Sequence, residues 1–371
     1  MNKRIWLSSP AMCGREKEYI ERAFEENWIA PLGPNVTGFE DEVCEYTGAK
    51  YAVAMTTGTA AMHMALRHEG VGRGDVVFCS SLTFAGSCNP TMYEGAAPVF
   101  IDSERESWNM SPGALERAFA KYPKASAVIV VNLYGQSADM DRITEICKNY
   151  GVPVVEDAAE SLGAKYKGRQ SGTMGRYGVF SFNGNKIITT SGGGMLVCPD
   201  EETKKKILKW ITQSRDSERH YEHSELGFNF RLSNICAGIG RGQLMVLGER
   251  VKQKKAIYGA YEKAFADIEE IEMMPVRDYG EPNYWLSCFT IKNRVKPIDV
   301  ILALERENIE SRPIWKPMHL QPFYKGYDYF AHDSDVSADI FERGLCLPSD
   351  VNMTGEDINR VIGIVRGCFG V

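Results

Sequence analysis

Residues 126–133 read SAVIVVNL, and this uninterrupted apolar run decides the fold class. A strand with apolar side chains on both of its faces is typical of a parallel sheet that helices cover on both sides. Comparable runs precede and follow it: YAVAM at 51–55, DVVFCS at 75–80, PVFID at 98–102, VPVVEDAA at 152–159, GVFSFN at 178–183 and GGMLVC at 193–198. We predict that these runs are strands of one large, mostly parallel sheet.

Amphipathic stretches alternate with these apolar runs. We expect helices from Thr59 to His68, near 85–94, from Pro112, and over 139–150, where apolar residues recur at helical spacing. Strands that alternate with helices indicate an α/β protein.

The pattern changes after about residue 233. We predict one long helix from Ser233 through Ile268, a strand over 283–291, a turn and helix in 295–309, and a final helix over 357–369. This division predicts a large domain at 14–245 and a smaller α/β domain at 246–371, with residues 1–13 packed against the smaller one.

Composition excludes several function classes. The net charge of -6 and the pI near 5.7 argue against nucleic acid as a partner. The sequence has neither an apolar run long enough to span a bilayer nor a secretory signal at its N-terminus, so we expect a cytoplasmic protein. The ten cysteines form no C-x-x-C pair and are expected to be reduced and mostly buried. No histidine pair has zinc-like companions, so no metal is expected.

Two candidate site segments follow predicted strands, where ligands bind in open parallel sheets. The first, Thr56-Thr57-Gly58-Thr59-Ala60, joins a strand to a helix, and free N–H groups at a helix N-terminus bind anions. The alternative is an ordinary helix cap formed by Thr59. The second segment, EDAAE at 156–160, closes an apolar strand with carboxylates, which are costly to bury unless they meet a cation such as a pyridinium nitrogen. The alternative is a helix-capping Asp157.

Two more segments complete the candidate site. In SFNGNK at 181–186, Lys186 lies in a turn between a strand and the glycines at 192–194, where desolvation can free the amine of its proton. The alternative is a surface lysine. The segment GFNFRLSN at 227–234 precedes the long helix, and its alternative is a polar loop with a serine cap. The glycines in GVGRGD (70–75) and GIGRG (238–242) do not complete a dinucleotide fingerprint.

These motifs, in this order, resemble the DegT/StrS-type nucleotide-sugar aminotransferases over nearly the whole chain. The matching stretches are NWIAPLGPNVTGFE at 27–40, TTGTAAMHMAL at 56–66, SSLTFAGS at 80–87, NLYGQ at 132–136, EDAAESLG at 156–163, SFNGNKIITTSGGGML at 181–196, GFNFRLSN at 227–234 and SRPIWKPMHLQ at 311–321. Two of these stretches, SFNGNKIITTSGGGML at 181–196 and RPIWKPMH at 312–319, look especially similar to the branch that aminates a UDP-linked 4-keto sugar in the UDP-N-acetylbacillosamine pathway. The resemblance implies fold type I of the pyridoxal 5'-phosphate (PLP) enzymes.

The resemblance also implies a role for individual residues. Lys186 matches the Schiff-base lysine, Asp157 the acid that pairs with the pyridine nitrogen, and Phe84 the aromatic residue that stacks on the ring. Glu160 matches a position near the phenolic oxygen, where the family often has His or Gln. The remaining matches are the phosphate cradle with Gly58, Thr59, Ala60 and Ser181, the partner subunit's phosphate contact Asn229, and the nucleotide-sugar region with Asn27, Trp28, Ile29, Ala30, Arg312, Trp315 and His319.

The function implied is transfer of an amino group from L-glutamate to C4 of a UDP-linked 4-keto-6-deoxy-N-acetylhexosamine, in a homodimer with shared active sites. Some members replace the Schiff-base lysine with histidine and are dehydratases, whereas this chain keeps Lys186. The alternatives are a C3-ketosugar or dTDP-4-ketosugar aminotransferase, another PLP enzyme such as a sugar dehydratase or an amino-acid lyase, and a non-catalytic PLP-binding regulatory protein.

Overall fold

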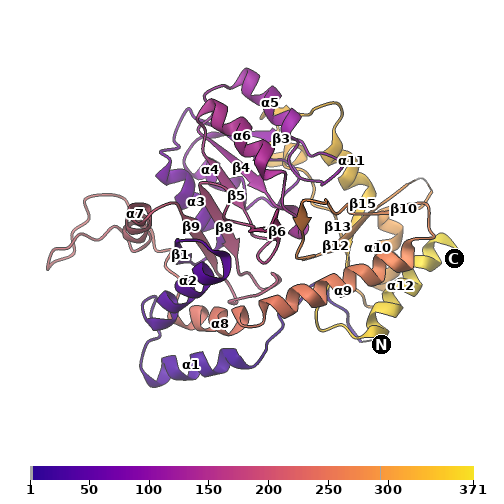
Figure 1. The fold of residues 1–371 in the computed structure, drawn as a ribbon, viewed down its shortest axis with the longest axis horizontal. Coiled ribbons are helices and arrows are strands. Elements are labelled where there is room, and N and C mark those ends of the chain that lie inside the picture. The colour runs from indigo at the N-terminus through magenta and orange to yellow at the C-terminus, as the bar shows by residue number, and fades with distance from the viewer. Residues whose placement is uncertain (1–2, 293) are drawn as a thin grey trace.

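The chain is described by a computed structural model that covers residues 3–292 and 294–371. Its centre is an eight-stranded sheet in the order β1-β9-β8-β5-β4-β2-β3-β14 (Figure 1). Only β9 runs antiparallel to its neighbours, so the predicted α/β fold with a mostly parallel sheet is confirmed. The strands are β1 (Tyr51–Met55), β2 (Val76–Ser80), β3 (Ala97–Ile101), β4 (Ala127–Val131), β5 (Val154–Asp157), β8 (Tyr177–Ser181), β9 (Gly194–Cys198) and β14 (Tyr329–Phe330).

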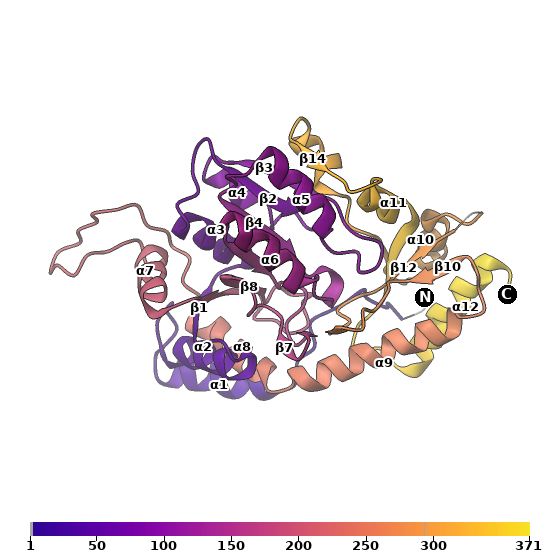
Figure 2. The ribbon, with the colours of Figure 1, turned by 45° about the horizontal axis from the view of Figure 1, so that its top comes forward.

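Helices cover both faces of this sheet. Successive residues of a strand point to opposite sides, so neighbouring residues pack against different helices. In β1, Val53 packs in the core that contains α3 (Gly58–His68) and α7 (Glu201–Ile211), whereas Ala54 packs with α2 (Pro34–Thr47). In β4, Ile129 joins the α3 side and Val130 joins α5 and α6 on the other. Figure 2 shows α5 (Pro112–Lys121) and α6 (Met140–Tyr150) together over one face, and α4 (Asn89–Tyr93) is the short helix after β2.

The single helix predicted from Ser233 through Ile268 is wrong, because the chain forms α8 (Asn234–Leu244) and α9 (Leu247–Phe265) instead. Val246 between them has φ −110° and ψ 6°, outside helical geometry. Helix α8 packs against α1 (Arg15–Glu25) and α2, while α9 extends to the smaller sheet (Figure 1). The two helices therefore pack on different neighbours.

The glycines of 238–242 allow this close packing of α8. A Cβ atom at Gly240 would lie 2.6 Å from the Phe39 ring, and one at Gly242 would lie 2.7 Å from the backbone N of Glu16. No side chain fits at such distances. The motif therefore serves helix packing.

The C-terminal part has its own four-stranded sheet, in the order β10-β12-β15-β13. Strand β12 begins only at Ser287, so residues 283–286 of the predicted strand 283–291 form a loop. Trp285 in this loop lines the cavity described in the next subsection. The two predicted helices near 297 and 357 are present. The elements are β10 (Ile271–Met273), β12 (Ser287–Ile291), β13 (Arg312–Pro313), β15 (Gly344–Leu347), α10 (Pro297–Arg306), α11 (Val336–Arg343) and α12 (Gly355–Phe369).

The division into domains at 14–245 and 246–371 stays a proposal. Two segments beyond residue 246 pair with strands of the N-terminal part: β14 lies beside β3, and β11 (Gly280–Glu281) beside β6 (Lys165–Tyr166). The N-terminal segment lies against the C-terminal part, because Ile5 forms a parallel bridge with Ile309 and Ser9 N donates to the Asp350 carboxylate at 2.7 Å.

Within the described ranges, no helix is long and apolar enough to cross a membrane. The same residues contain no group of three or more His, Cys, Asp or Glu side chains that could hold a metal ion. The ten cysteines are free thiols, six of them buried, and burial raises the pKa of Cys147 and of Cys198 to about 12.

Candidate active site

A cavity of about 330 Å³ opens at the carboxyl ends of β4, β5 and β8, where ligands bind in such sheets. We call it the lysine cavity. Three of the four segments singled out in the sequence meet there, although they are far apart along the chain. The predicted site residues that line it are Gly58, Thr59, Phe84, Asp157, Glu160, Ser181, Lys186 and Trp315.

Lys186 follows β8, and its side chain is only 13% exposed. Its Nζ lies 3.8 Å from Glu160 Oε1 and 4.1 Å from the centre of the Trp285 ring. Burial lowers the pKa of Lys186, and the Glu160 and Asp157 carboxylates oppose this shift. A lowered pKa favours the neutral amine, which is the form that attacks a carbonyl.

Neighbouring acids at the end of β5 face opposite sides of the sheet. Asp157 lines the lysine cavity, and burial raises its pKa while hydrogen bonds from Ser87 and from Ala159 N oppose this. Glu156 is fully buried on the other side, where the backbone N–H groups of Gly172 and Met174 donate to it at 2.7 and 2.9 Å. Asp157 is therefore the acid available to a ligand.

Glu160 is held by an aromatic residue with an unusual backbone. Tyr134 has φ 50°, a left-handed conformation that is uncommon outside glycine, and its N–H donates to Glu160 Oε2 at 2.7 Å. Trp315 Nε1 donates to Glu160 Oε1 at 3.2 Å, and the Tyr134 hydroxyl accepts from Trp315 N at 2.9 Å. Burial raises the pKa of Glu160, with Lys186 opposing.

The N-terminus of α3 forms a wall of the lysine cavity. The cap of this helix is Thr57 rather than Thr59: Thr57 Oγ1 accepts from Ala60 N at 3.0 Å, so Thr59 is free for another role. Ala60 is buried and does not line the cavity. A Cβ atom at Gly194 would lie 2.3 Å from Gly58 N, so glycine is required where β9 passes this turn.

Phe84 forms an exposed wall, with 57% of its surface open to solvent. Its ring centre lies 5.5 Å from that of Trp315. A flat apolar surface in this position suits an aromatic ligand ring.

The other predicted substrate residues lie outside the lysine cavity. The segment 27–30 is exposed and is anchored by Asn234, whose side chain donates to Trp28 O at 2.7 Å and whose N donates to Ala30 O. Arg312 is exposed and pairs with Glu310 at 2.8 Å. The His319 ring stacks on the Tyr329 ring, with 3.7 Å between the ring centres, and it is hydrogen-bonded to Ser81 Oγ and to the Asp335 carboxylate.

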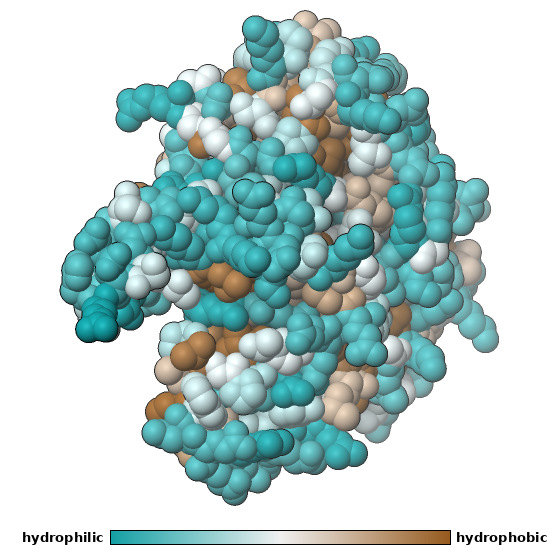
Figure 3. Space-filling view, turned by 60° about the vertical axis from the view of Figure 1, so that its left-hand side comes forward, coloured by the Kyte–Doolittle hydropathy of each residue, from teal (hydrophilic) through white to brown (hydrophobic). Residues whose placement is uncertain are grey.

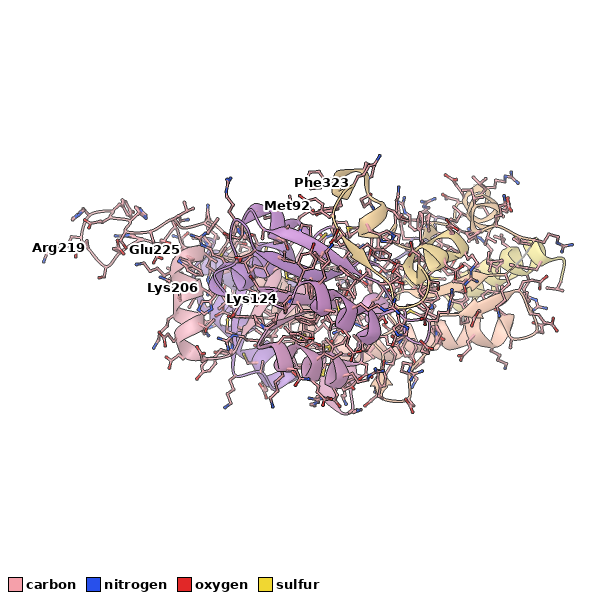
Figure 4. All side chains as sticks on the ribbon, turned by 90° about the horizontal axis from the view of Figure 1, so that it is seen from above. Met92, Lys124, Lys206, Arg219, Glu225 and Phe323 are labelled. Carbon is pink, nitrogen blue, oxygen red and sulfur yellow. The ribbon has the colours of Figure 1, made fainter. Side chains whose placement is uncertain are left out.

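Asn229 is exposed and lies on the segment 212–231, which joins α7 to α8 and protrudes from the body (Figures 1 and 2). In Figure 3 this protruding segment is hydrophilic. Figure 4 shows Arg219 near its tip and Glu225 beside Lys206 at its base, where the two side chains pair at 2.8 Å. Arg231, by contrast, is turned inward and pairs with Glu40.

Several cavity residues were not predicted as site residues. Trp285 was assigned to a strand, and Asn185 was quoted only within the lysine turn. Tyr134, which does not line the cavity but donates to Glu160, was quoted only within NLYGQ. Trp285 reaches Lys186 through tertiary packing, which has no local sequence signal. The lysine cavity is also lined by Thr57, Met62, Thr83, Gly86, Ser87, Val131, Ala159, Val179, Asn183, Gly192 and Gly193.

The residues present fit pyridoxal phosphate. The backbone N–H groups of Gly58 and Thr59, which the Thr57 cap does not bind, suit the phosphate. Asp157 suits a protonated ring nitrogen, and Lys186 suits the aldehyde. Gly58 passes close to β8, since a Cβ atom there would lie 3.2 Å from Ser181 Cβ, so glycine suits this turn. A mostly parallel α/β sheet with this set of groups defines a fold type I PLP enzyme.

Comparison with known proteins gives the family. Residues 10–366 match the model of the DegT/DnrJ/EryC1/StrS aminotransferase family. The chain belongs to this family, and it is a PLP-dependent sugar aminotransferase.

Individual relatives cover almost the whole chain. A protein of Bacillus subtilis (strain 168) named "Putative pyridoxal phosphate-dependent aminotransferase EpsN" is 52% identical, over 100% of this chain and 97% of its own. GDP-perosamine synthase of Caulobacter vibrioides is 36% identical, over 97% of this chain and 96% of its own. Among solved structures, a DegT DnrJ EryC1 StrS aminotransferase from Brucella abortus has 30% identity and a TM-score of 0.89 over 96% of each chain.

Proposed function

We propose that this enzyme transfers an amino group from L-glutamate to C4 of a UDP-linked 4-keto-6-deoxy-N-acetylhexosamine, and that it acts in the cytoplasm. The observation that carries the proposal is a lysine cavity that adjoins a second, larger cavity. Sugar chemistry takes place at Lys186, and the neighbouring cavity has room for the nucleotide.

Bound PLP supplies an electron sink that stabilises negative charge on the substrate carbon during transamination. Lys186 would hold the cofactor, and its neutral amine would move a proton at the substrate carbon. Asp157 would keep the ring nitrogen protonated. Phe84 would support the ring, and Glu160 would face its phenolic oxygen. Gly58, Thr59, Ala60 and Ser181 would hold the phosphate.

The second cavity, of about 640 Å³, shares Thr83, Phe84 and Trp315 with the lysine cavity. Its walls include the aromatic Tyr324 and the exposed cation Lys316, which suit a base or sugar face and a diphosphate respectively. Met92 and Phe323, which also line it, lie close together in Figure 4. Tyr324 is 2% exposed and bonded to Asn89, so it is a fixed wall.

Trp315 is the predicted substrate residue best placed for this role. Asn27, Trp28, Ile29, Ala30, Arg312 and His319 remain proposed contacts to the nucleotide sugar, at a distance from the lysine cavity in the single chain. The two-subunit site proposed below would give the exposed residues among them a route to substrate, whereas the His319 side chain is only 9% exposed.

The substrate is tested by incubating the PLP-loaded enzyme with glutamate and each of the UDP-, dTDP- and GDP-linked 4-keto sugars. We expect amination of the UDP sugar, with the new nitrogen located at C4 by NMR and a kcat/KM about tenfold or more above the others. Amination of only a dTDP or GDP sugar, or amination at C3, would refute this substrate, but the assignment as a sugar aminotransferase would stand.

We also propose a homodimer in which Asn229 of one subunit reaches the cofactor phosphate of the other. Mixing inactive Lys186→Ala chains with inactive Asn229→Ala chains should restore activity, because each heterodimer has one site with both residues. Random exchange predicts about a quarter of the parent's activity. Arg219→Ala, on the same protruding segment, is the matched control. No recovery after confirmed subunit exchange would indicate a site built within one chain.

A further inference from the structure

The peptide bond in front of Lys186 is held by side chains from distant parts of the chain. The carbonyl oxygen of Asn185 accepts hydrogen bonds from Trp285 Nε1 at 2.8 Å and from Ser8 Oγ at 3.1 Å. Neither donor belongs to the large sheet that carries the turn. The position of Lys186 therefore depends on the N-terminal segment and on the loop before β12.

Lys254, in α9, holds both of these donors. Its Nζ donates to Ser8 Oγ and to the carbonyl oxygen of Trp285, each at 3.0 Å. The side chain is buried, and burial lowers its pKa to about 7, with Asp350 opposing the shift. Lys254 does not line the lysine cavity, so its costly burial is explained by what it holds.

Trp285 also covers the Lys186 amine directly. The ring centre lies 4.1 Å from Nζ, and a ring face attracts a protonated amine more than a neutral one. Trp285 is itself fixed: it is 1% exposed, its backbone N–H donates to Asn283 Oδ1 at 2.8 Å, and its ring stacks near that of Tyr134. A fixed ring gives the amine a constant environment.

We propose that Trp285 and Lys254 are positioning residues for Lys186. Lys254 fixes Trp285 and Ser8, these two fix the Asn185–Lys186 peptide bond, and the Trp285 ring favours the protonated form of the Lys186 nitrogen. This inference rests on Lys186 being the lysine that binds the cofactor, which peptide mapping tests separately.

The test uses PLP-loaded Trp285→Leu, Trp285→Phe and Lys254→Met, with Lys255→Met on the exposed side of α9 as the control. The absorbance of the bound cofactor is titrated with pH, and the glutamate half-reaction is followed in single turnover. Trp285→Leu should lower the titration midpoint by about half a pH unit or more, because the protonated form loses the ring. Trp285→Phe and Lys254→Met should slow the half-reaction about tenfold, because the amine is misplaced.

A merely structural role would lower the melting temperature and leave the titration midpoint unchanged. Folded variants with the parent's midpoint and a half-reaction rate within about twofold of the parent would overturn the proposal. If Lys254→Met does not fold, Ser8→Ala carries the test, since it removes one donor to Asn185 from a half-buried position. Ser8→Ala and Trp285→Phe should then be non-additive, because they share one acceptor, and additive effects would overturn the proposal.

Discussion

Lys186→Ala should abolish covalent binding of the cofactor and reduce turnover by roughly a thousandfold or more, because we propose that the same amine binds PLP and moves the proton. Lys186 is the only lysine that lines the lysine cavity among the described residues. Borohydride reduction of the parent enzyme, followed by peptide mapping, should label Lys186 alone.

Lys254 makes this experiment informative, because it is a second buried lysine and its pKa is lowered to about 7. Lys254→Ala should keep the borohydride label on Lys186. Labelling of Lys254, or of any other lysine, would show that the cofactor is bound elsewhere and would remove the basis of the mechanism.

Asp157→Asn should leave the cofactor bound but slow the half-reaction by a factor on the order of 10²–10³, because the ring nitrogen loses its ionic partner. Asp157 is buried and lines the lysine cavity, where an ionic contact is stronger than in water. Cofactor content is measured by absorbance, and the rate by single turnover with glutamate.

Glu156→Gln is the matched control, because Glu156 is the adjacent residue and faces away from the cavity. Its loss of charge should weaken the bonds from Gly172 N and Met174 N, which lowers the free energy of unfolding by about 1–3 kcal/mol but leaves the half-reaction rate near that of the parent. A near-normal rate in Asp157→Asn would contradict the assigned role.

Local sequence patterns predicted the parts of the fold that depend on local chemistry. The apolar runs became the strands of the large sheet, and the segments that follow β1, β5 and β8 meet in one cavity because parallel strands bring their carboxyl ends to the same edge. The alternative in which Thr59 caps α3 is wrong, because Thr57 is the cap; Thr57 and Thr59 are equally good capping residues by type.

The remaining features depend on contacts between distant segments. The break at Val246 separates two helices with different neighbours, although the sequence there has no proline. Trp285 and Ser8 reach Asn185 across 100 and 177 residues respectively. Such contacts leave no periodic pattern, so residue-by-residue analysis could not find them.

The position of the N-terminal segment has a consequence for how the protein is made. Ile5 pairs with Ile309, and Lys3 with Asp357, so these residues have no partners until the last part of the chain has left the ribosome. Closing such a long loop is entropically slow, and it should come late in folding. Because Ser8 on this segment also contacts Asn185, the lysine turn would reach its final form only at the end of synthesis. A nascent chain released early should therefore bind cofactor poorly.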